Sequence, residues 1–210
     1  ENSNHNFNMI KAKLFGFTEK NSDGLKEYLD EDYLDYANSI ILSRNGELKK
    51  SLSIINKLLK KYPSNFFLIE TKADLLLSHG YTNIANKFYK LILEKEESNF
   101  YVKKRIFEIE FHQIKENKKK INKDFLYSFS DLILIFRKDN ILQEKFKELY
   151  VNQNNIGWQN LVDANIYINN KHNDKALKLL DNIVVSSNDK KLVYYAKQLI
   201  KQIELWKMVQ

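Results

Sequence analysis

Histidines and clustered carboxylates are the residue types of this chain that could carry catalysis or hold a metal. No two histidines form an HExxH pair, the pattern that places two zinc ligands on one helix face. The chain has 5 Gly and no Cys, which leaves little from which to build a phosphate-binding loop or a thiolate site. The sequence therefore predicts no catalytic residue, metal site or cofactor in this chain. The residues considered are His5, His79, His112, His172, Glu94, Glu96 and Glu97.

A second group of residues has the chemistry of a peptide-binding surface. They are aromatic, aliphatic and acidic side chains that recur at helical spacing on two predicted helices. In a stack of helical hairpins the first helix of each hairpin lines a concave groove, so its outward positions meet a ligand. A solvated groove without a ligand is the alternative. The predicted groove residues are Tyr33, Tyr36, Ile40 and Ser43 on one helix, and Phe67, Glu70, Asp74 and Leu77 on the next.

A period of 34 residues places these two helices. Gly46 and Gly80 stand at matching positions of the period, where a helix would end. Small residues also match, and they would let the two helices of a hairpin cross closely. A 34-residue helix-turn-helix period is typical of tetratricopeptide (TPR) repeats, although an ordinary antiparallel helical bundle remains the alternative. The other matching pairs are Ser39 with Ala73, Leu42 with Leu76, Ser51 with Ala85, and Ile55 with Tyr89.

The remaining segments also read as helices, so the predicted fold class is all-α. We expect a TPR-like antiparallel helical-hairpin solenoid, a right-handed superhelix with an irregular middle hairpin. An opening helix over Asn6–Phe17 has Met9, Ile10, Ala12 and Leu14 available to bury. The middle hairpin would pair Phe125–Phe136 with Ile141–Asn152. The predicted organisation is a linker helix and loop over 1–30 and a repeat domain over 31–210, with repeats at 32–65 and 66–99, a degenerate part at 100–155, a repeat-like part at 157–188 and a capping helix at 189–208.

The charge of the chain invites a nucleic-acid interpretation, because 34 Lys and Arg outnumber 27 Asp and Glu. Only Arg44, Arg105 and Arg137 are arginines, however, and arginine is the preferred residue for phosphate and base contacts. The lysines are spread along the chain, and the densest run, Lys118 to Lys120, is short. We therefore expect a protein or peptide partner rather than a nucleic acid. No apolar run approaches the ~20 residues needed to span a bilayer.

Several segments together resemble the C-terminal TPR domain of BepA-like periplasmic zinc metallopeptidases. The segment His5–Phe17 resembles the family's linker helix, of the form H-x-x-M-x-A-K-L-x-G-F. Further likeness is carried by Tyr33 to Ala37, Leu58 to Phe67, Ile69 to Gly80, and the hairpin that follows Trp158. The family's zinc-binding HExxH helix has no counterpart here, so no catalytic residue carries over.

The resemblance implies a function and a compartment. The chain would be the non-catalytic part of a protease in outer-membrane protein quality control, with the zinc held by a separate domain. It would recruit outer-membrane protein substrates or dock on their assembly machinery, and it would be periplasmic. Two alternatives remain open: a free-standing, cytoplasmic TPR-like scaffold unrelated to proteolysis, and a helical nucleic-acid binder.

Overall fold

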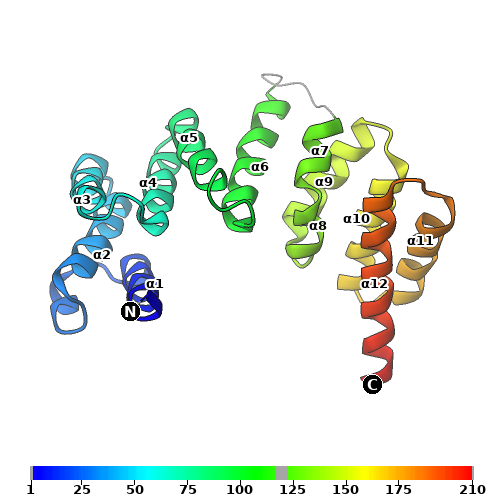
Figure 1. The fold of residues 1–210 in the computed structure, drawn as a ribbon, viewed down its shortest axis with the longest axis horizontal. Coiled ribbons are helices and arrows are strands. Elements are labelled where there is room, and N and C mark those ends of the chain that lie inside the picture. The colour runs from blue at the N-terminus through cyan, green and yellow to red at the C-terminus, as the bar shows by residue number, and fades with distance from the viewer. Residues whose placement is uncertain (1, 117–122, 210) are drawn as a thin grey trace. The chain divides into compact units, whose positions relative to one another are not determined.

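The computed structural model describes residues 2–116 and 123–209, and within these ranges it is all-helical with no strand (Figure 1). The predicted fold class is confirmed: successive helices pack against one another as antiparallel hairpins. The Lys118–Lys120 run lies outside the described residues. The α-helices are α1 (Asn2–Thr18), α2 (Glu31–Arg44), α3 (Leu48–Lys61), α4 (Phe66–Ser78), α5 (Thr82–Leu93), α6 (Phe100–Lys115), α7 (Lys123–Phe129), α8 (Asp131–Ile135), α9 (Asn140–Asn152), α10 (Ile156–Asn169), α11 (Asn173–Ser186) and α12 (Lys190–Val209), and a 3-10 helix covers Asp23–Glu27.

The chain divides into two compact units, Glu1–Ile109 and Glu110–Gln210, called here the first and the second unit. The boundary lies within α6, whereas the sequence placed one after residue 30. Helix α1 packs against α2, and its Met9 and Ala12 belong to the same buried cluster as the core of the first hairpin. The predicted linker helix is therefore an integral part of the first unit.

The small residues of the 34-residue period are buried where the helices of each hairpin cross. Helix α2, with Ser39, packs against α3, with Ser51, and α4, with Ala73, packs against α5, with Ala85; all four residues have no exposed surface. The same arrangement returns in the second unit, where Ala164 of α10 and Ala176 of α11 are equally buried. Side chains this small let two helix axes approach closely, and the larger residues around them fill the space between the helices.

Four hairpins share one turn geometry. In each, a backbone N–H bonds the carbonyl oxygen five residues earlier, at 2.8–3.0 Å, and one turn residue has a positive φ. Gly46 and Gly80 adopt this φ at no steric cost, as the sequence predicted. Asn154 (φ 51°) and Lys171 (φ 62°) adopt it in the second unit without a glycine. The bonds are Glu47 N to Leu42 O, Tyr81 N to Leu76 O, Asn155 N to Tyr150 O, and His172 N to Tyr167 O.

The period extends one helix further than the sequence suggested. Helix α6 begins at Phe100, 34 residues after the start of α4 at Phe66. Both helices have an asparagine as N-cap: the Asn65 side chain accepts from Leu68 N at 3.2 Å, and that of Asn99 accepts from Val102 N at 3.1 Å. Such caps satisfy an N–H group that the helix itself leaves free. The period then stops because α6 runs on to Lys115 without a turn.

The predicted helix over Phe125–Phe136 is wrong, because the structure breaks it at Ser130 into α7 and α8. Buried amides from two other helices bind the free carbonyl groups at the end of α8. Gln143 of α9 donates to Ile133 O at 3.1 Å and to Phe136 O at 3.2 Å, and Asn165 of α10 donates to Ile133 O at 3.0 Å. Because these donors replace the helix's own hydrogen bonds, the chain can turn there inside the core.

Helix α12 closes the second unit by packing against α11 and α10, as predicted for a capping helix. Gly157 at the start of α10 lies so close to α12 that an added Cβ would stand 2.8 Å from Leu192 Cδ2. Among the described helices, none combines the length and apolarity that a membrane crossing requires.

Candidate binding surface on the first unit

Three of the predicted groove residues are core residues instead. Tyr36, Ile40 and Ser43 are 0%, 2% and 6% exposed. The Tyr36 hydroxyl lies 2.6 Å from Thr71 Oγ1 of α4, and burial raises the pKa of this phenol well above its ordinary value. These side chains cannot meet a partner, so the prediction is wrong for them. The reason is that α1 covers this side of α2.

A glycine lets α1 approach α2 closely. At Gly16 an added Cβ would stand 2.7 Å from Ile40 Cβ and 3.0 Å from the Ala37 carbonyl oxygen. Met9 and Ala12, on the same side of α1, are buried as predicted. The first unit thus uses this side of α1 to complete its core.

Polar groups fix α1 against α4 and the start of α2. The Lys13 ammonium lies 2.8 Å from Glu70 Oε1 and 3.8 Å from Asp74 Oδ2. The His5 ring lies between the Tyr33 hydroxyl, 2.8 Å from Nδ1, and Asn65 Nδ2, 3.0 Å from Nε2. Three of the predicted groove residues, Tyr33, Glu70 and Asp74, are therefore contacted by α1.

The two remaining predicted residues are half-buried apolar side chains. Phe67 packs against the core of the first unit, and Leu77 is partly exposed near the end of α4. Neither contributes a polar group to the surface that α1 covers.

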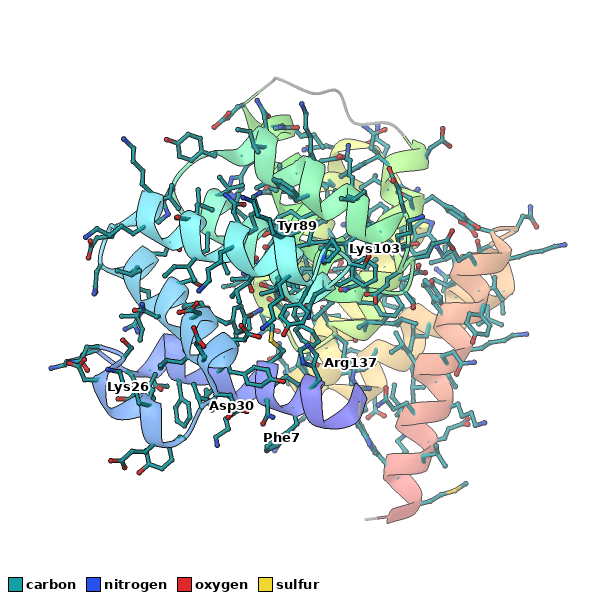
Figure 2. The ribbon with its side chains drawn as sticks, turned by 60° about the vertical axis from the view of Figure 1, so that its left-hand side comes forward. Phe7, Lys26, Asp30, Tyr89, Lys103 and Arg137 are labelled. Atoms are coloured by element: carbon teal, nitrogen blue, oxygen red, sulfur yellow. The ribbon has the colours of Figure 1, made fainter. Side chains whose placement is uncertain are left out.

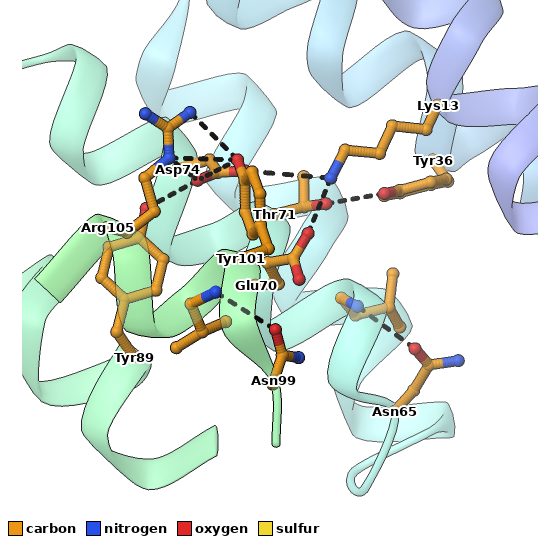
Figure 3. A network of polar contacts seen from close by, with 12 residues as sticks. Lys13, Tyr36, Asn65, Glu70, Thr71, Asp74, Tyr89, Asn99, Tyr101 and Arg105 are labelled. Carbon is orange, nitrogen blue, oxygen red and sulfur yellow. Dashed lines mark hydrogen bonds and ion pairs between the residues drawn. The ribbon is translucent and has the colours of Figure 1, made fainter. Parts of the chain in front are cut away.

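Asp74 is the centre of a polar network that sequence reasoning missed (Figure 3). Its Oδ1 accepts from the Tyr89 hydroxyl at 2.6 Å, and the Tyr101 hydroxyl lies 3.2 and 3.1 Å from its two oxygens. Arg105 Nε lies 3.7 Å from Oδ1 and donates to the Tyr101 oxygen at 3.1 Å. Tyr101 stands 34 residues after Phe67, so the period carried one step further pointed to it.

The electrostatics of this network are those of a structural contact. Burial, and then the Asp74 carboxylate, raise the pKa of Tyr101 to about 12 and that of Tyr89 further still. Both phenols therefore stay protonated at neutral pH and donate hydrogen bonds to Asp74. Asp74 thus accepts hydrogen bonds from both phenols and lies beside the Lys13 ammonium and the Arg105 guanidinium.

A small cavity of about 260 Å³ lies beside the start of α1, lined in part by His5, Tyr33, Asp32 and Tyr62. Asp32 Oδ2 accepts from the Tyr62 hydroxyl at 2.6 Å and from Lys61 at 2.5 Å. The hydrogen bond from Lys61, followed by that from Tyr62, lowers the pKa of Asp32. The polar groups of the cavity are thus largely paired with one another.

The outward side of α1 is apolar and has no partner within the described first unit. Phe7, Ile10, Leu14 and Phe17, the α1 stripe, are 64%, 56%, 60% and 53% exposed. The side chain of Phe7 projects away from the ribbon (Figure 2). The sequence interpretation expected Ile10 and Leu14 to be buried, and that is wrong. A 3-4-3 spacing places all four residues on one face, which is the face that Met9 and Ala12 do not use.

The geometry defines a class of protein but not a reaction. Residues 2–116 and 123–209 contain no group of three His, Cys, Asp or Glu side chains arranged to hold a metal ion. The chain is an all-α helical-hairpin repeat protein with an apolar helix face open to solvent. No protein-family model matches it, and no curated protein matches it either.

Proposed function

We propose that this chain is an interaction domain that docks an amphipathic helix of a partner protein on the α1 stripe. The observation that carries the proposal is the stripe itself: four large apolar residues, each more than half exposed, in a row on one helix. Contiguous exposed apolar patches are rare on monomers and mark interaction sites.

The spacing of the stripe favours a helical partner. Residues at positions i, i+3, i+7 and i+10 form a straight seam, into which the apolar side chains of a second helix pack. An extended strand would instead need an open sheet edge, which the described residues do not have.

The charges beside the stripe favour an acidic partner. Helix α1 carries Lys11 and Lys13 on opposite sides of the stripe and contains no Asp or Glu. A partner helix with Glu beside its apolar seam would complement these charges, whereas one with Lys would be repelled. Lys13 is already paired with Glu70, so Lys11 supplies most of this preference.

A designed peptide tests the proposal directly. The probe is a fluorescently labelled helix of about three heptads with Leu at the seam and Glu beside it, and its twin has Lys in place of Glu. We expect saturable binding of the Glu peptide in an anisotropy titration, and weaker binding of the Lys peptide. Leu14→Glu should weaken binding by at least about tenfold, because it places a charge in the seam.

The matched control is Val185→Glu on α11, since Val185 is 87% exposed and lies in the second unit. This variant should bind like the wild type. The proposal would be contradicted if neither peptide bound, or if the Leu14→Glu variant bound the Glu peptide as tightly as the wild type does. So would a wild-type dimer that Leu14→Glu dissociates, because the occupant of the stripe would then be a second copy.

We further propose that the parent of this domain is a BepA-like periplasmic zinc metallopeptidase, and that the partner belongs to outer-membrane protein quality control. Support comes from the resemblance of His5–Phe17 to the linker helix of that family. Several of those residues have a structural role: Met9 and Ala12 are buried, Gly16 lies against α2, and Lys13 forms an ion pair with Glu70.

The coding sequence upstream of Glu1 tests this second part separately. An HExxH helix and a signal peptide in the same reading frame would support it. A start codon directly before Glu1 would leave a free-standing interaction protein, the alternative function.

A further inference from the structure

The second unit contains an aromatic and acidic cavity that the proposed function does not use. It has a volume of about 200 Å³ and is called here the Trp158 pocket. Among the described residues, its lining includes two carboxylates and no lysine or arginine. The lining residues used below are Asp124, Tyr127, Tyr150, Asn155, Trp158 and Asp189.

Aromatic rings surround Trp158 in this pocket. The Tyr150 ring is stacked on Trp158, with centroids 5.7 Å apart and planes 13° apart. Tyr127 and Tyr195 approach it edge-on, at 6.3 and 5.9 Å. The indole Nε1 donates to Asp189 Oδ2 at 2.9 Å, which fixes the orientation of the ring. Rings held next to carboxylates form the environment that attracts organic cations.

The same aromatic cluster already holds an ammonium group. Lys191 Nζ lies 4.5 Å from the centroid of the Tyr127 ring and 5.7 Å from that of Tyr195. It also lies 3.1 Å from Asp131 Oδ1 and donates to the Tyr127 carbonyl oxygen at 3.0 Å. Within the second unit, the Tyr127 and Tyr195 rings and the Asp131 carboxylate thus bind one primary ammonium group together.

Tyr150 supplies an unused polar group at the pocket. Its side chain is 1% exposed, and its hydroxyl has no hydrogen-bond partner among the described residues. A buried hydroxyl without a partner is costly. Burial, and then the nearby Asp189 carboxylate, raise the pKa of Tyr150 well above its ordinary value. The neutral hydroxyl oxygen therefore keeps an acceptor position that no described residue uses.

We infer that the Trp158 pocket binds a primary alkylammonium group. Asp124 attracts its charge, the aromatic rings enclose it, and the Tyr150 hydroxyl accepts a hydrogen bond from it. The cavity is of the size of a lysine side chain rather than of a larger cofactor. The ammonium belongs either to a lysine of a polypeptide or to a free amine, and the chemistry of recognition is the same for both.

The test is a fluorescence titration with n-butylammonium chloride at constant ionic strength. The 210-residue chain has two tryptophans, so Trp206→Phe leaves Trp158 as the only tryptophan that reports. We expect a saturable change in Trp158 emission with n-butylammonium and none with 1-butanol, its neutral analogue. Cadaverine and a short peptide with one lysine then separate the sources. Tighter binding of the peptide assigns the site to polypeptides, and tighter binding of cadaverine assigns it to free amines.

Two variants separate binding from folding. Asp124→Asn is a mild change at an exposed side chain, and it should weaken n-butylammonium binding by at least about tenfold. Tyr150→Phe removes only the unpaired oxygen, so it should weaken binding while the melting temperature stays the same or rises. An equal response to 1-butanol, no saturation, or unchanged affinity in Asp124→Asn would each overturn the inference. A Tyr150→Phe variant with wild-type affinity would remove the hydroxyl from the site and overturn that part.

Discussion

The ammonium of Lys13 lies 2.8 Å from Glu70 Oε1, and this contact places α1 on the surface where the sequence predicted a partner. Of the predicted positions on α2 and α4, Tyr33, Glu70 and Asp74 contact the chain's own first helix, and Tyr36, Ile40 and Ser43 lie in the core. The side of the molecule that remains open for binding is consequently the outward side of α1. The following predictions test this arrangement and the fold that supports it.

Reversing the charge of Lys13 should destabilise the first unit. In Lys13→Glu, three carboxylates would meet at Glu70 and Asp74, and we expect a loss of about 1–2 kcal/mol in unfolding free energy, measured by urea denaturation. Adding Glu70→Lys should restore part of it. The control is Lys50→Glu in the exposed pair of Lys50 and Glu47, which should change stability by less than about 0.5 kcal/mol. Equal effects at the two pairs would contradict the docking of α1.

The close approach at Gly16 predicts a steric effect. Gly16→Ala would bring a methyl group within 3.0 Å of the Ala37 carbonyl oxygen, which is backbone and cannot rotate away. We expect a loss of about 1–3 kcal/mol, as for other overpacked cores. Gly24→Ala is the matched control, because an added Cβ there meets nothing within 4 Å. If both variants melt at the wild-type temperature, α1 does not lie on α2.

Ser51 and Ser39 should respond in opposite ways to the same substitution. Both are fully buried, but Ser39 Oγ donates to Tyr36 O at 2.6 Å, whereas Ser51 Oγ has no partner among the described residues. Ser51→Ala should therefore stabilise the protein by about 1 kcal/mol, and Ser39→Ala should destabilise it by a similar amount. The equivalent residues of the other hairpins, Ala85 and Ala176, are already alanine. Thermal unfolding of the two single variants decides the sign.

The turn at Lys171 should gain stability from a glycine. Its φ of 62° is costly for a residue with a Cβ, while Gly46 adopts a φ of 83° freely. Lys171→Gly should raise the unfolding free energy by about 0.5–1 kcal/mol, and Gly46→Ala should lower it by about 1 kcal/mol. A Lys171→Gly variant that is less stable than the wild type would show that the lysine side chain has a role of its own.

The buried tyrosines predict how stability falls at high pH. The pKa of Tyr101 is raised to about 12, and those of Tyr36, Tyr89, Tyr150 and Tyr195 are raised too. Between the ordinary value of 10.0 and these raised values, the unfolded chain loses protons that the folded chain keeps. The stability that these phenols contribute is therefore fully present below pH 10 and is lost as the pH rises above it. Near-ultraviolet absorbance should show these phenols ionising together with loss of helical circular dichroism, after the exposed ones.

The hairpins were predictable because their signals are local. Small residues at crossings and glycines at turns recur in the sequence with the helices that need them, so Ala85 and Gly80 could be recognised from Ser51 and Gly46. The positive φ at Asn154 and Lys171 was not predicted, because no glycine marks these two turns, although asparagine tolerates such a φ better than most residues.

The predictions that were wrong failed because they depend on contacts between segments that are far apart in the sequence. The end of α8 is fixed in part by Asn165, which donates to Ile133 O from 32 residues further along the chain. The burial of Tyr36 and Ile40 depends on α1, which alone would read as a linker. Periodicity identifies a face of a helix, but it does not say which other segment covers that face.

The close contact between Gly16 and Ile40 has a consequence for which substitutions evolution can accept at position 16. Because the constraint comes partly from the Ala37 backbone, which no substitution at position 40 removes, position 16 should remain glycine in homologous chains. Gly157 should be freer to drift, since its neighbour is only the mobile tip of Leu192. Position 16 is therefore expected to be invariant in an alignment, and position 157 is not.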